Sequence, residues 1–258
     1  MKRSHFLSLM SLAGISLMTT GSAAEEKGGG RCFELRIYYA AEGKLDALHT
    51  RFRDHTMKLF ERHGMTNVAY WVPLDNPERR LVYLLSYPGL AAREASWKAF
   101  QADPEWVAAK SASETSGTLV AKVENRFLGL TDFSPEMKLE AGAPHVFEMR
   151  TYTATAGNLP RLLERFRKHT ISLFTKHGMR HFGYFTPLPG QPGADDTLVY
   201  FLAHASKESQ AASFGAFRED PEWLKVKGES ETGAGGPLTV PDGVKSELMK
   251  PTDYSPVK

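Results

Sequence analysis

Residues 33–65 read FELRIYYAAEGKLDALHTRFRDHTMKLFERHGM, and the phrase returns at residues 147–179 as FEMRTYTATAGNLPRLLERFRKHTISLFTKHGM. Of these 33 aligned positions, 18 are identical. Such identity at a fixed spacing indicates an internal duplication. The match continues downstream, where YWVPL, LVY, DPEW and TDFSP correspond to YFTPL, LVY, DPEW and TDYSP. The 258 residues are therefore predicted to form two repeats, each the size of one small domain.

Each repeat shows the same order of predicted elements. In the first copy, residues 33–39 alternate around β-favouring side chains and predict a strand. A helix over residues 44–63 follows from the spacing of its apolar side chains, and Gly64 is suited to its C′ position. The rest of the copy is predicted to be strands over 65–74 and 79–87, a helix over 90–101 that restarts after Asp103, and a strand over 118–130.

This order, βαββαβ, defines the ferredoxin-like α+β unit, whose helices cover one face of its sheet. The duplication supplies a second sheet of matching shape, so we expect the two repeats to form an intrachain dimeric α/β barrel. The first strand carries two sets of side chains on opposite faces, Phe33, Leu35 and Ile37 against Glu34, Arg36 and Tyr38. We place the apolar set under the helices and the polar set between the sheets.

The first 24 residues have the features of a secretory signal. Lys2 and Arg3 precede an apolar run at residues 6–18, and Ala24 ends a group of small residues. The run is too short to span a bilayer of about 30 Å. We therefore expect export to the periplasm or the medium. The predicted boundaries are 1–24 for the signal peptide, 25–32 for a flexible spacer, 33–135 for repeat 1, 136–144 for a linker and 145–258 for repeat 2.

Charge and cysteine content narrow the possible partners. Removal of the signal would leave 30 basic and 30 acidic residues, which gives no electrostatic footprint for nucleic acid or anionic lipid. Cys32 is the only cysteine, so no disulfide can form within the chain. We expect its thiol to be exposed, and either to pair between chains or to be incidental.

The phrases F-E-[LM]-R-x-Y, R-F-R-x-H-T, H-G-M, D-P-E-W and T-D-[FY]-S-P together resemble those of NIPSNAP-domain proteins, over nearly the whole of both repeats. The resemblance implies the dimeric α/β-barrel superfamily, with the dimer folded into one chain. That superfamily includes small monooxygenases, isomerases and haem-binding enzymes, whereas NIPSNAP proteins have no settled catalytic activity. The resemblance thus implies the fold and leaves the reaction open.

Two histidines are the candidate catalytic residues. His55 and His169 occupy equivalent positions on the apolar stripe of the long helix. One interpretation is a buried, hydrogen-bonded core histidine. The other is a general base or ligand at a cavity, because imidazole suits proton transfer near neutral pH and binds haem iron. His63 and His177 fit helix C-cap positions better.

The polar faces of the first strands form the candidate binding site. Arginine can hold a carboxylate through two hydrogen bonds and tyrosine can add a third, although a buried salt-bridged face is the alternative. The candidate ligand-binding residues are Glu34, Arg36, Tyr38 and Tyr70 in repeat 1 and Glu148, Arg150, Tyr152 and Tyr184 in repeat 2. The helix arginines Arg51, Arg53, Arg165 and Arg167 are predicted to form a solvated face.

The sequence lacks the common catalytic signatures. It has no HExxH, no cysteine pair, no phosphate-binding glycine loop and no G-x-S-x-G elbow, so no metal site and no cofactor are predicted. We therefore expect a module of the cell envelope that binds a small ligand or a protein partner. The alternatives are a monooxygenase- or isomerase-like enzyme using His55 or His169 with arginine and tyrosine, and a haem-binding protein using one of these histidines. A closed, aromatic-packed barrel favours the module, and an open pocket at either histidine favours the enzyme. Further association of the pseudo-dimers is left open.

Overall fold

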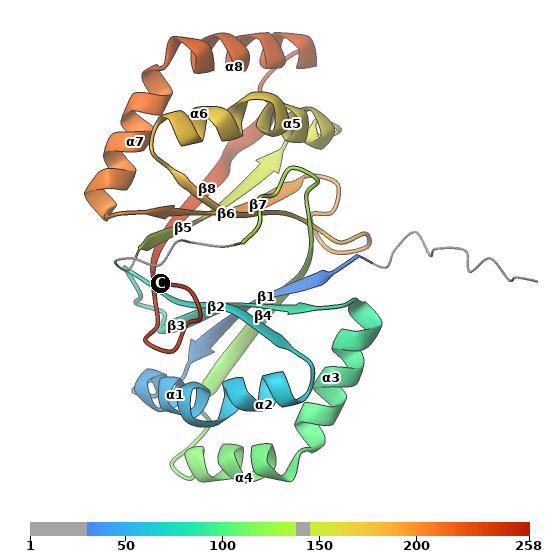
Figure 1. Cartoon of the computed structure of the whole chain (residues 1–258), viewed down its shortest axis with the longest axis vertical. Helices are drawn as coiled ribbons and strands as arrows, with labels where there is room; N and C mark the ends of the chain where they lie inside the picture. Colours follow the sequence, from blue (N-terminus) through green and yellow to red (C-terminus); the bar gives the residue numbers. More distant parts are fainter. Residues whose placement is uncertain (1–29, 138–144) are drawn as a thin grey trace, which may run out of the picture.

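The protein was analysed as a computed structural model that describes residues 30–137 and 145–258 (Figure 1). The predicted signal peptide and most of the predicted spacer and linker lie outside these residues. The predicted order of elements is confirmed in both repeats. Repeat 1 comprises β1 (Cys32–Ala40), α1 (Leu45–Arg51), η1 (Phe52–Thr56), α2 (Met57–Arg62), β2 (Thr66–Pro73), β3 (Arg80–Tyr87), α3 (Leu90–Ala102), α4 (Pro104–Ser113) and β4 (Val120–Leu130). Repeat 2 comprises β5 (Val146–Ala154), α5 (Leu159–Arg165), η2 (Phe166–Thr170), α6 (Ile171–Lys176), β6 (Arg180–Pro187), β7 (Thr197–His204), α7 (Lys207–Glu219), α8 (Pro221–Ala234) and β8 (Thr239–Pro251).

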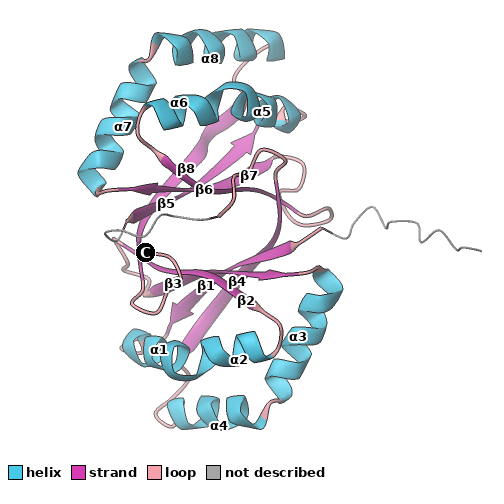
Figure 2. Ribbon diagram, in the orientation of Figure 1, coloured by secondary structure: helices cyan, strands magenta, loops and turns pink. Residues whose placement is uncertain are grey.

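The eight strands close into a barrel in the order β1-β3-β2-β8-β5-β7-β6-β4. Two antiparallel junctions join the repeats, β2 with β8 and β4 with β6. Figure 2 shows the sheets in the middle of the molecule and the helices as two outer layers, one for each repeat. The intrachain α/β barrel expected from the duplication is therefore confirmed. Within the described residues, no helix has both the length and the apolar character to cross a membrane.

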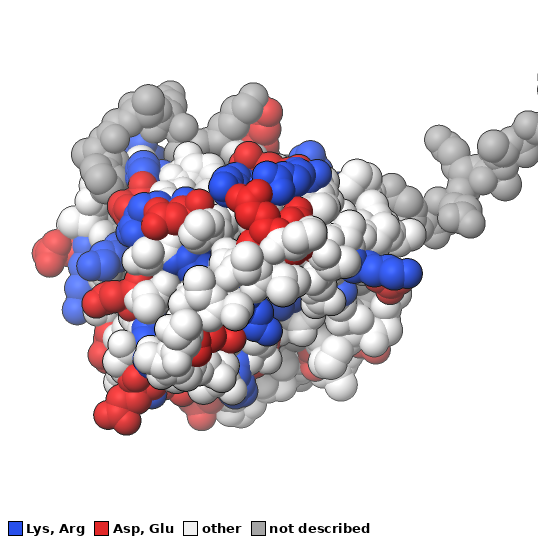
Figure 3. Space-filling model, turned by 90° about the horizontal axis from the view of Figure 1, so that it is seen from below, with Lys and Arg blue, Asp and Glu red and all other residues white. Residues whose placement is uncertain are grey.

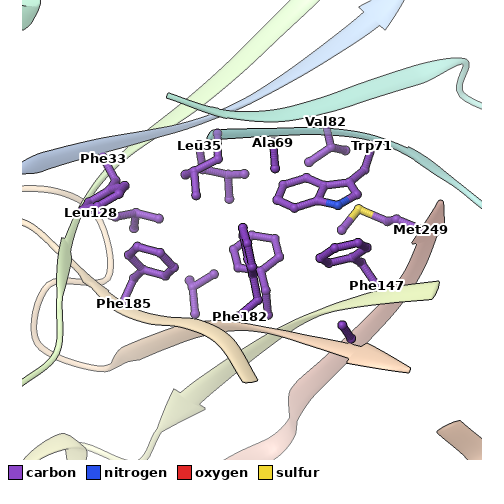
Figure 4. Close-up of a cluster of buried hydrophobic side chains, with 14 residues drawn as sticks. Phe33, Leu35, Ala69, Trp71, Val82, Leu128, Phe147, Phe182, Phe185 and Met249 are labelled. Atoms are coloured by element: carbon purple, nitrogen blue, oxygen red, sulfur yellow. The ribbon is translucent and has the colours of Figure 1, made fainter. Parts of the chain in front are cut away.

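The interior of the barrel is apolar, which reverses the expected orientation of the strands. Phe33 and Leu35 point between the sheets, where they meet Trp71, Phe147 and Phe185 (Figure 4). Glu34, Arg36 and Tyr38, with their counterparts Glu148, Arg150 and Tyr152, lie on the helix side and not in the inter-sheet space. The prediction was wrong because both faces of the sheet are buried. The donors for Glu34 lie on the helix side, Arg93 and Trp97 on α3 together with Tyr87 and Asn125 on the neighbouring strands. The middle of the interior is closed and packed with aromatic side chains, and a space of about 50 Å³ lies beside Leu35. At the end of the barrel near Thr151 and Lys245, a pocket of about 630 Å³ opens between the repeats.

The long helix of each repeat contains a π turn. The Met57 N–H bonds the carbonyl of Phe52, five residues earlier, and Ile171 repeats the contact to Phe166. Residues in a π turn rotate by less than the roughly 100° of an α-helix, so His55 stops short of the buried face and Thr56 takes its place. His55 and His169 are therefore half-buried, which differs from the interpretation of a buried core histidine.

Each repeat ends in a tail that crosses to the other repeat, residues 131–135 and 252–256. The Tyr70 N–H donates to Ser255 Oγ at 3.0 Å, and the Thr252 N–H donates to the Tyr70 carbonyl at 2.9 Å. Arg53 forms a two-point ion pair with Asp253, at 2.6 and 2.8 Å. The other tail makes the matching contacts, Tyr184 with Ser134, Thr131 with Tyr184 and Arg167 with Asp132. The repeated T-D-[FY]-S-P phrase thus binds each repeat to the other.

The helix arginines divide into two kinds. The side chains of Arg53 and Arg167 are about 40% exposed and bind the tails, whereas Arg51 and Arg165 are buried, at 4 and 5% exposure. The prediction of a solvated face was wrong for this second pair. Cys32 is also buried, not exposed as expected, and burial raises the pKa of its thiol to about 11.

Candidate functional site

Repeat 1 contains a pocket of about 800 Å³ between the outer face of its sheet and the helices α1, η1, α3 and α4. Its inner walls are buried residues, and its rim includes the exposed Val107 and Val123. The aromatic part of the lining is Tyr38, Phe52, Phe60, Trp97, Phe100 and Trp106, and the charged part is Arg36, Arg51, Lys110 and Glu114. A buried floor with an exposed rim, apolar walls and a few converging polar groups is typical of small-molecule sites.

Arg51 reaches this pocket because of the local helix geometry. It is the last residue of α1, directly before the π turn, and Thr56 Oγ1 donates to its carbonyl at 3.1 Å. Its Nη1 donates to Glu114 at 2.8 Å and to Ser113 at 3.2 Å, and its guanidinium lies 5.3 Å from the ring centre of Trp106. Its Nε is buried and has no hydrogen-bond partner among the described residues. The pocket therefore borders a buried cation with a free donor.

Arg36 forms the second cationic wall and is held by Glu34. Its Nη1 donates to Glu34, its Nε donates to Tyr83 at 2.9 Å, and its Nη2 donates to Tyr38 at 3.2 Å. The guanidinium lies 4.3 Å from the ring centre of Trp97. This cation is fully partnered, so its position in the wall is fixed.

Glu34 is wholly buried and carries a second guanidinium. Arg93 donates to both of its oxygens, at 3.0 and 2.8 Å, and Tyr87, Trp97 and Asn125 also donate to it. Burial raises the pKa of this carboxyl, but the bonds from Arg93 and the charge of Arg36 outweigh burial, and the net pKa is lowered. One carboxylate thus faces two arginines.

Repeat 2 has an equivalent buried carboxylate, Glu148, with different partners. Arg150 is the one arginine among the described residues that pairs with Glu148, whose other contacts are His204 at 3.0 Å, Gln210 at 3.1 Å and Ser246. Burial raises the pKa of Glu148, but the bond from His204, the charge of Arg150 and the bond from Ser246 bring it down to about 2. The positions of Arg93 and Trp97 are taken in repeat 2 by Gln210 and Phe214. The two copies have therefore diverged around the same buried carboxylate.

The predicted ligand-binding residues fall into three places. Arg36 and Tyr38 line the pocket, and Glu34 lies behind Arg36. Tyr70 packs beneath the helix and bonds Asn67 through its hydroxyl, so it is part of the helix–sheet core. In repeat 2, Glu148, Arg150 and Tyr152 are joined by contacts equivalent to those of repeat 1, and the Tyr184 hydroxyl bonds His181 at 2.7 Å.

Sequence reasoning missed Arg51, Trp97, Trp106 and Glu114 as pocket residues. A signal for two of them was present. Arg51 belongs to the R-F-R-x-H-T phrase and Trp106 to D-P-E-W, and both phrases are repeated without change at their polar and aromatic positions. The tryptophan of the second phrase packs 4.4 Å from Phe100, ring centre to ring centre.

The candidate histidines do not line this pocket. His55 is half-buried, and its Nδ1 has no partner among the described residues. His169 borders a separate groove of about 580 Å³ between α5, η2 and α8. Only Pro160 and Val226 are apolar in that lining apart from Gly233, so the groove does not suit the apolar faces of a haem. The described residues contain no group of three His, Cys, Asp or Glu side chains placed to hold a metal ion.

His63 and His177 are helix C-cap residues, as predicted, and each has a further contact. His63 Nε2 lies 2.8 Å from Asp103, which caps α4 by accepting the Glu105 N–H, and His177 bonds Asp220 in the same way at 2.7 Å. The H-G-M and D-P-E-W phrases are therefore joined in space. Figure 3, which views the molecule from below Figure 1, shows acidic and basic side chains interspersed on the surface.

Comparisons with known proteins place the fold and leave the chemistry open. The family profile described as NIPSNAP matches residues 33–135 and 147–256. No curated protein matches the chain in sequence. A proposed monooxygenase from Fusobacterium nucleatum superposes with a TM-score of 0.55 at 8% identity, over 86% of this chain and 93% of the other. A proposed monooxygenase from Lactobacillus acidophilus superposes with a TM-score of 0.54 at 9% identity, over 89% of this chain and 99% of the other. A NIPSNAP family protein of unknown function from Agrobacterium tumefaciens superposes with a TM-score of 0.37 at 21% identity, over 42% of this chain and 94% of the other.

Proposed function

The chain belongs to the NIPSNAP family, with one family module in each repeat, and we propose that it is a binding protein for a small molecule held in the pocket of repeat 1. The observation that carries this proposal is the buried pocket itself, in which two guanidiniums and two indoles converge below an exposed rim. The aromatic filling of the middle of the barrel supports the same conclusion, because it leaves no room for a ligand at that level, and the space at one end of the barrel is lined mainly by polar side chains.

The proposal is tested with N-phenyl-1-naphthylamine, an uncharged probe whose fluorescence rises in apolar surroundings. Ser111 lies on the pocket lining, and its counterpart in repeat 2 is Gly228. The variant Ser111→Phe should obstruct the pocket and abolish saturable binding, whereas the matched control Gly228→Phe should bind the probe as the parent protein does. Failure of the parent protein to bind the probe, or equal binding by Ser111→Phe, would contradict the proposal.

We also propose that the protein acts outside the cytoplasm. Support comes from the basic start of the chain, the short apolar run at residues 6–18 and the small residues that end at Ala24. N-terminal sequencing of protein from the periplasm or medium should therefore begin at Glu25. Recovery of intact Met1 from that fraction would contradict cleavage.

A second candidate function, a small-molecule enzyme of the monooxygenase or isomerase kind, rests on the groove at His169. Arg165 and Lys168 border the same groove, so an imidazole and two cations share one open surface. Under this alternative, His169→Gln should keep the melting temperature and lose turnover, while the matched His55→Gln should keep both. Loss of stability without loss of turnover would remove the candidate.

A further inference from the structure

We infer that the ligand of the repeat 1 pocket is an aromatic anion whose charged group binds Arg51 in place of Glu114. The inference rests on the proposed function and specifies its ligand. Three independent features lead to it: the charge balance around the pocket, a free donor on a buried cation, and the aromatic lining.

The charge balance is positive. The guanidiniums of Arg36 and Arg93 share the single carboxylate of Glu34, and Arg51 is matched only by Glu114. Lys110 adds a further cation at the rim. Among the residues that line the pocket, three cations therefore face one carboxylate, and Glu34 behind the wall is shared by Arg36 and Arg93. This excess of positive charge favours the entry of an anion.

The free donor is on Arg51. Its side chain is 4% exposed, it lines the pocket, and its Nε has no partner, although a guanidinium offers five donors in a rigid fork. A carboxylate or sulfonate that replaced Glu114 at Nη1 would also reach Nη2, its neighbour at the end of the fork, and make a two-point contact, whereas the buried Nε lies on the other edge. Glu114 is the group that such an anion would displace, because it binds the same guanidinium and is itself 19% exposed at the pocket wall.

The walls suit a flat, unsaturated carrier. Trp97 stacks on one guanidinium and Trp106 on the other, so both cations are already positioned against aromatic faces. Phe52, Phe60 and Phe100 complete the apolar surface. An aliphatic acid would leave these faces without matching contacts, whereas an aromatic acid would use both parts of the pocket.

Repeat 2 provides an internal control. Arg165 is equally buried and also has an unpartnered Nε, but its Nη1 is 3.6 Å from Glu231 and it borders the open groove. Gln210 and Phe214 replace Arg93 and Trp97, so this copy lacks the second guanidinium on its buried glutamate and one of the two indoles, while Trp223 still stacks on Arg165. Arg165→Gln should therefore cost stability as Arg51→Gln does, without the same effect on binding.

The experiment compares two fluorescent probes of nearly the same shape, 8-anilinonaphthalene-1-sulfonate, which carries a sulfonate, and N-phenyl-1-naphthylamine, which does not. We expect the sulfonate probe to bind more tightly, and unlabelled 2-naphthoate to displace it. Arg51→Gln should weaken binding of the sulfonate probe by at least about tenfold, the effect of losing one charge-assisted hydrogen bond, and should weaken binding of the neutral probe far less. Arg51→Lys should restore part of the preference, and Arg165→Gln should leave both affinities unchanged.

The variant Glu114→Gln keeps the experiment decisive if Arg51→Gln fails to fold. Removal of this internal competitor should tighten binding of the sulfonate probe relative to that of the neutral probe. Equal affinity for the two probes in the parent protein, or equal losses for both in Arg51→Gln, would overturn the inference while the proposed function stands. Absence of binding by either probe would overturn the proposed function as well.

Discussion

The two buried carboxylates allow a matched test of how charge is balanced in the repeats. Glu34 and Glu148 are both fully buried and both accept from the arginine two residues later on the same strand. They differ because Glu34 also neutralises Arg93, whose position in repeat 2 holds the uncharged Gln210. Substitution of each glutamate by glutamine should therefore leave two unpaired guanidiniums in repeat 1 and one in repeat 2.

The expected magnitudes follow from these partners. Breaking a buried ion pair by removal of one member costs about 3–5 kcal/mol, and Glu34→Gln should lie at the upper end of that range. Glu148→Gln retains a carbonyl acceptor for its neutral donors and loses one charge pair, so about 3 kcal/mol or less is expected. The difference of about 2 kcal/mol would separate the two urea midpoints by roughly 1 M if m is about 2 kcal/mol/M.

A double variant checks the cause. Arg93→Gln copies the residue of repeat 2, so Glu34→Gln with Arg93→Gln should be more stable than Glu34→Gln alone, although it carries one more substitution. Urea denaturation followed by tryptophan fluorescence and by circular dichroism measures each free energy of unfolding. Equal losses from Glu34→Gln and Glu148→Gln, or a double variant less stable than the single one, would refute the reasoning.

Three further predictions concern the whole chain. The pKa of Glu148 is lowered from 4.5 to about 2, so its carboxylate contributes about 3 kcal/mol of stability above pH 4.5. This contribution is lost as the pH falls towards 2, and in Glu148→Gln the melting temperature should therefore depend less on pH over that range. Residues 25–141 alone should aggregate or homodimerise, as a sizing column would show, because the inner sheet face around Trp71 would be exposed. A stable monomer of this fragment would count against the need for the second repeat. Tyr254→Ala should lower the free energy of unfolding by about 2 kcal/mol, more than Asp253→Ala does, because the ring packs in the helix–sheet core while the ion pair is exposed.

Much of the fold follows from local signals in the sequence. Asp103 with Pro104 marks a helix start through capping, Gly64 marks a helix end through its positive φ of 77°, and the duplication supplies the second sheet. The alternation on β1 separates two sets of side chains, but it does not say which set meets the helices. That choice depends on Arg93 and Trp97, which reach Glu34 from about 60 positions away.

The pocket was harder to predict because it depends on a π turn. Hydrophobic periodicity treats the helix of residues 45–62 as one regular element, so it places His55 on the buried face and Arg51 in solvent. The change of pitch that begins at Phe52 turns Thr56 inward in place of His55. Arg51 precedes this turn and is buried by its contacts with Trp106 on α4 and with Glu114, the residue after that helix. A charge that is buried by a tertiary partner gives no apolar signal in the sequence.

The crossed tails give this protein a particular order of assembly during synthesis. Tyr70 receives its tail contact from Ser255, 185 positions later, and His49 bonds Tyr254 across 205 positions. Repeat 1 therefore leaves the ribosome long before the residues that complete its surface and its strand junction exist. Contacts of such long range slow folding, and an incomplete N-terminal repeat would stay open to proteases and chaperones while repeat 2 is translated. Chains arrested before Thr239 should thus be cut rapidly within residues 33–135, and chains released after Pro256 should resist cleavage there.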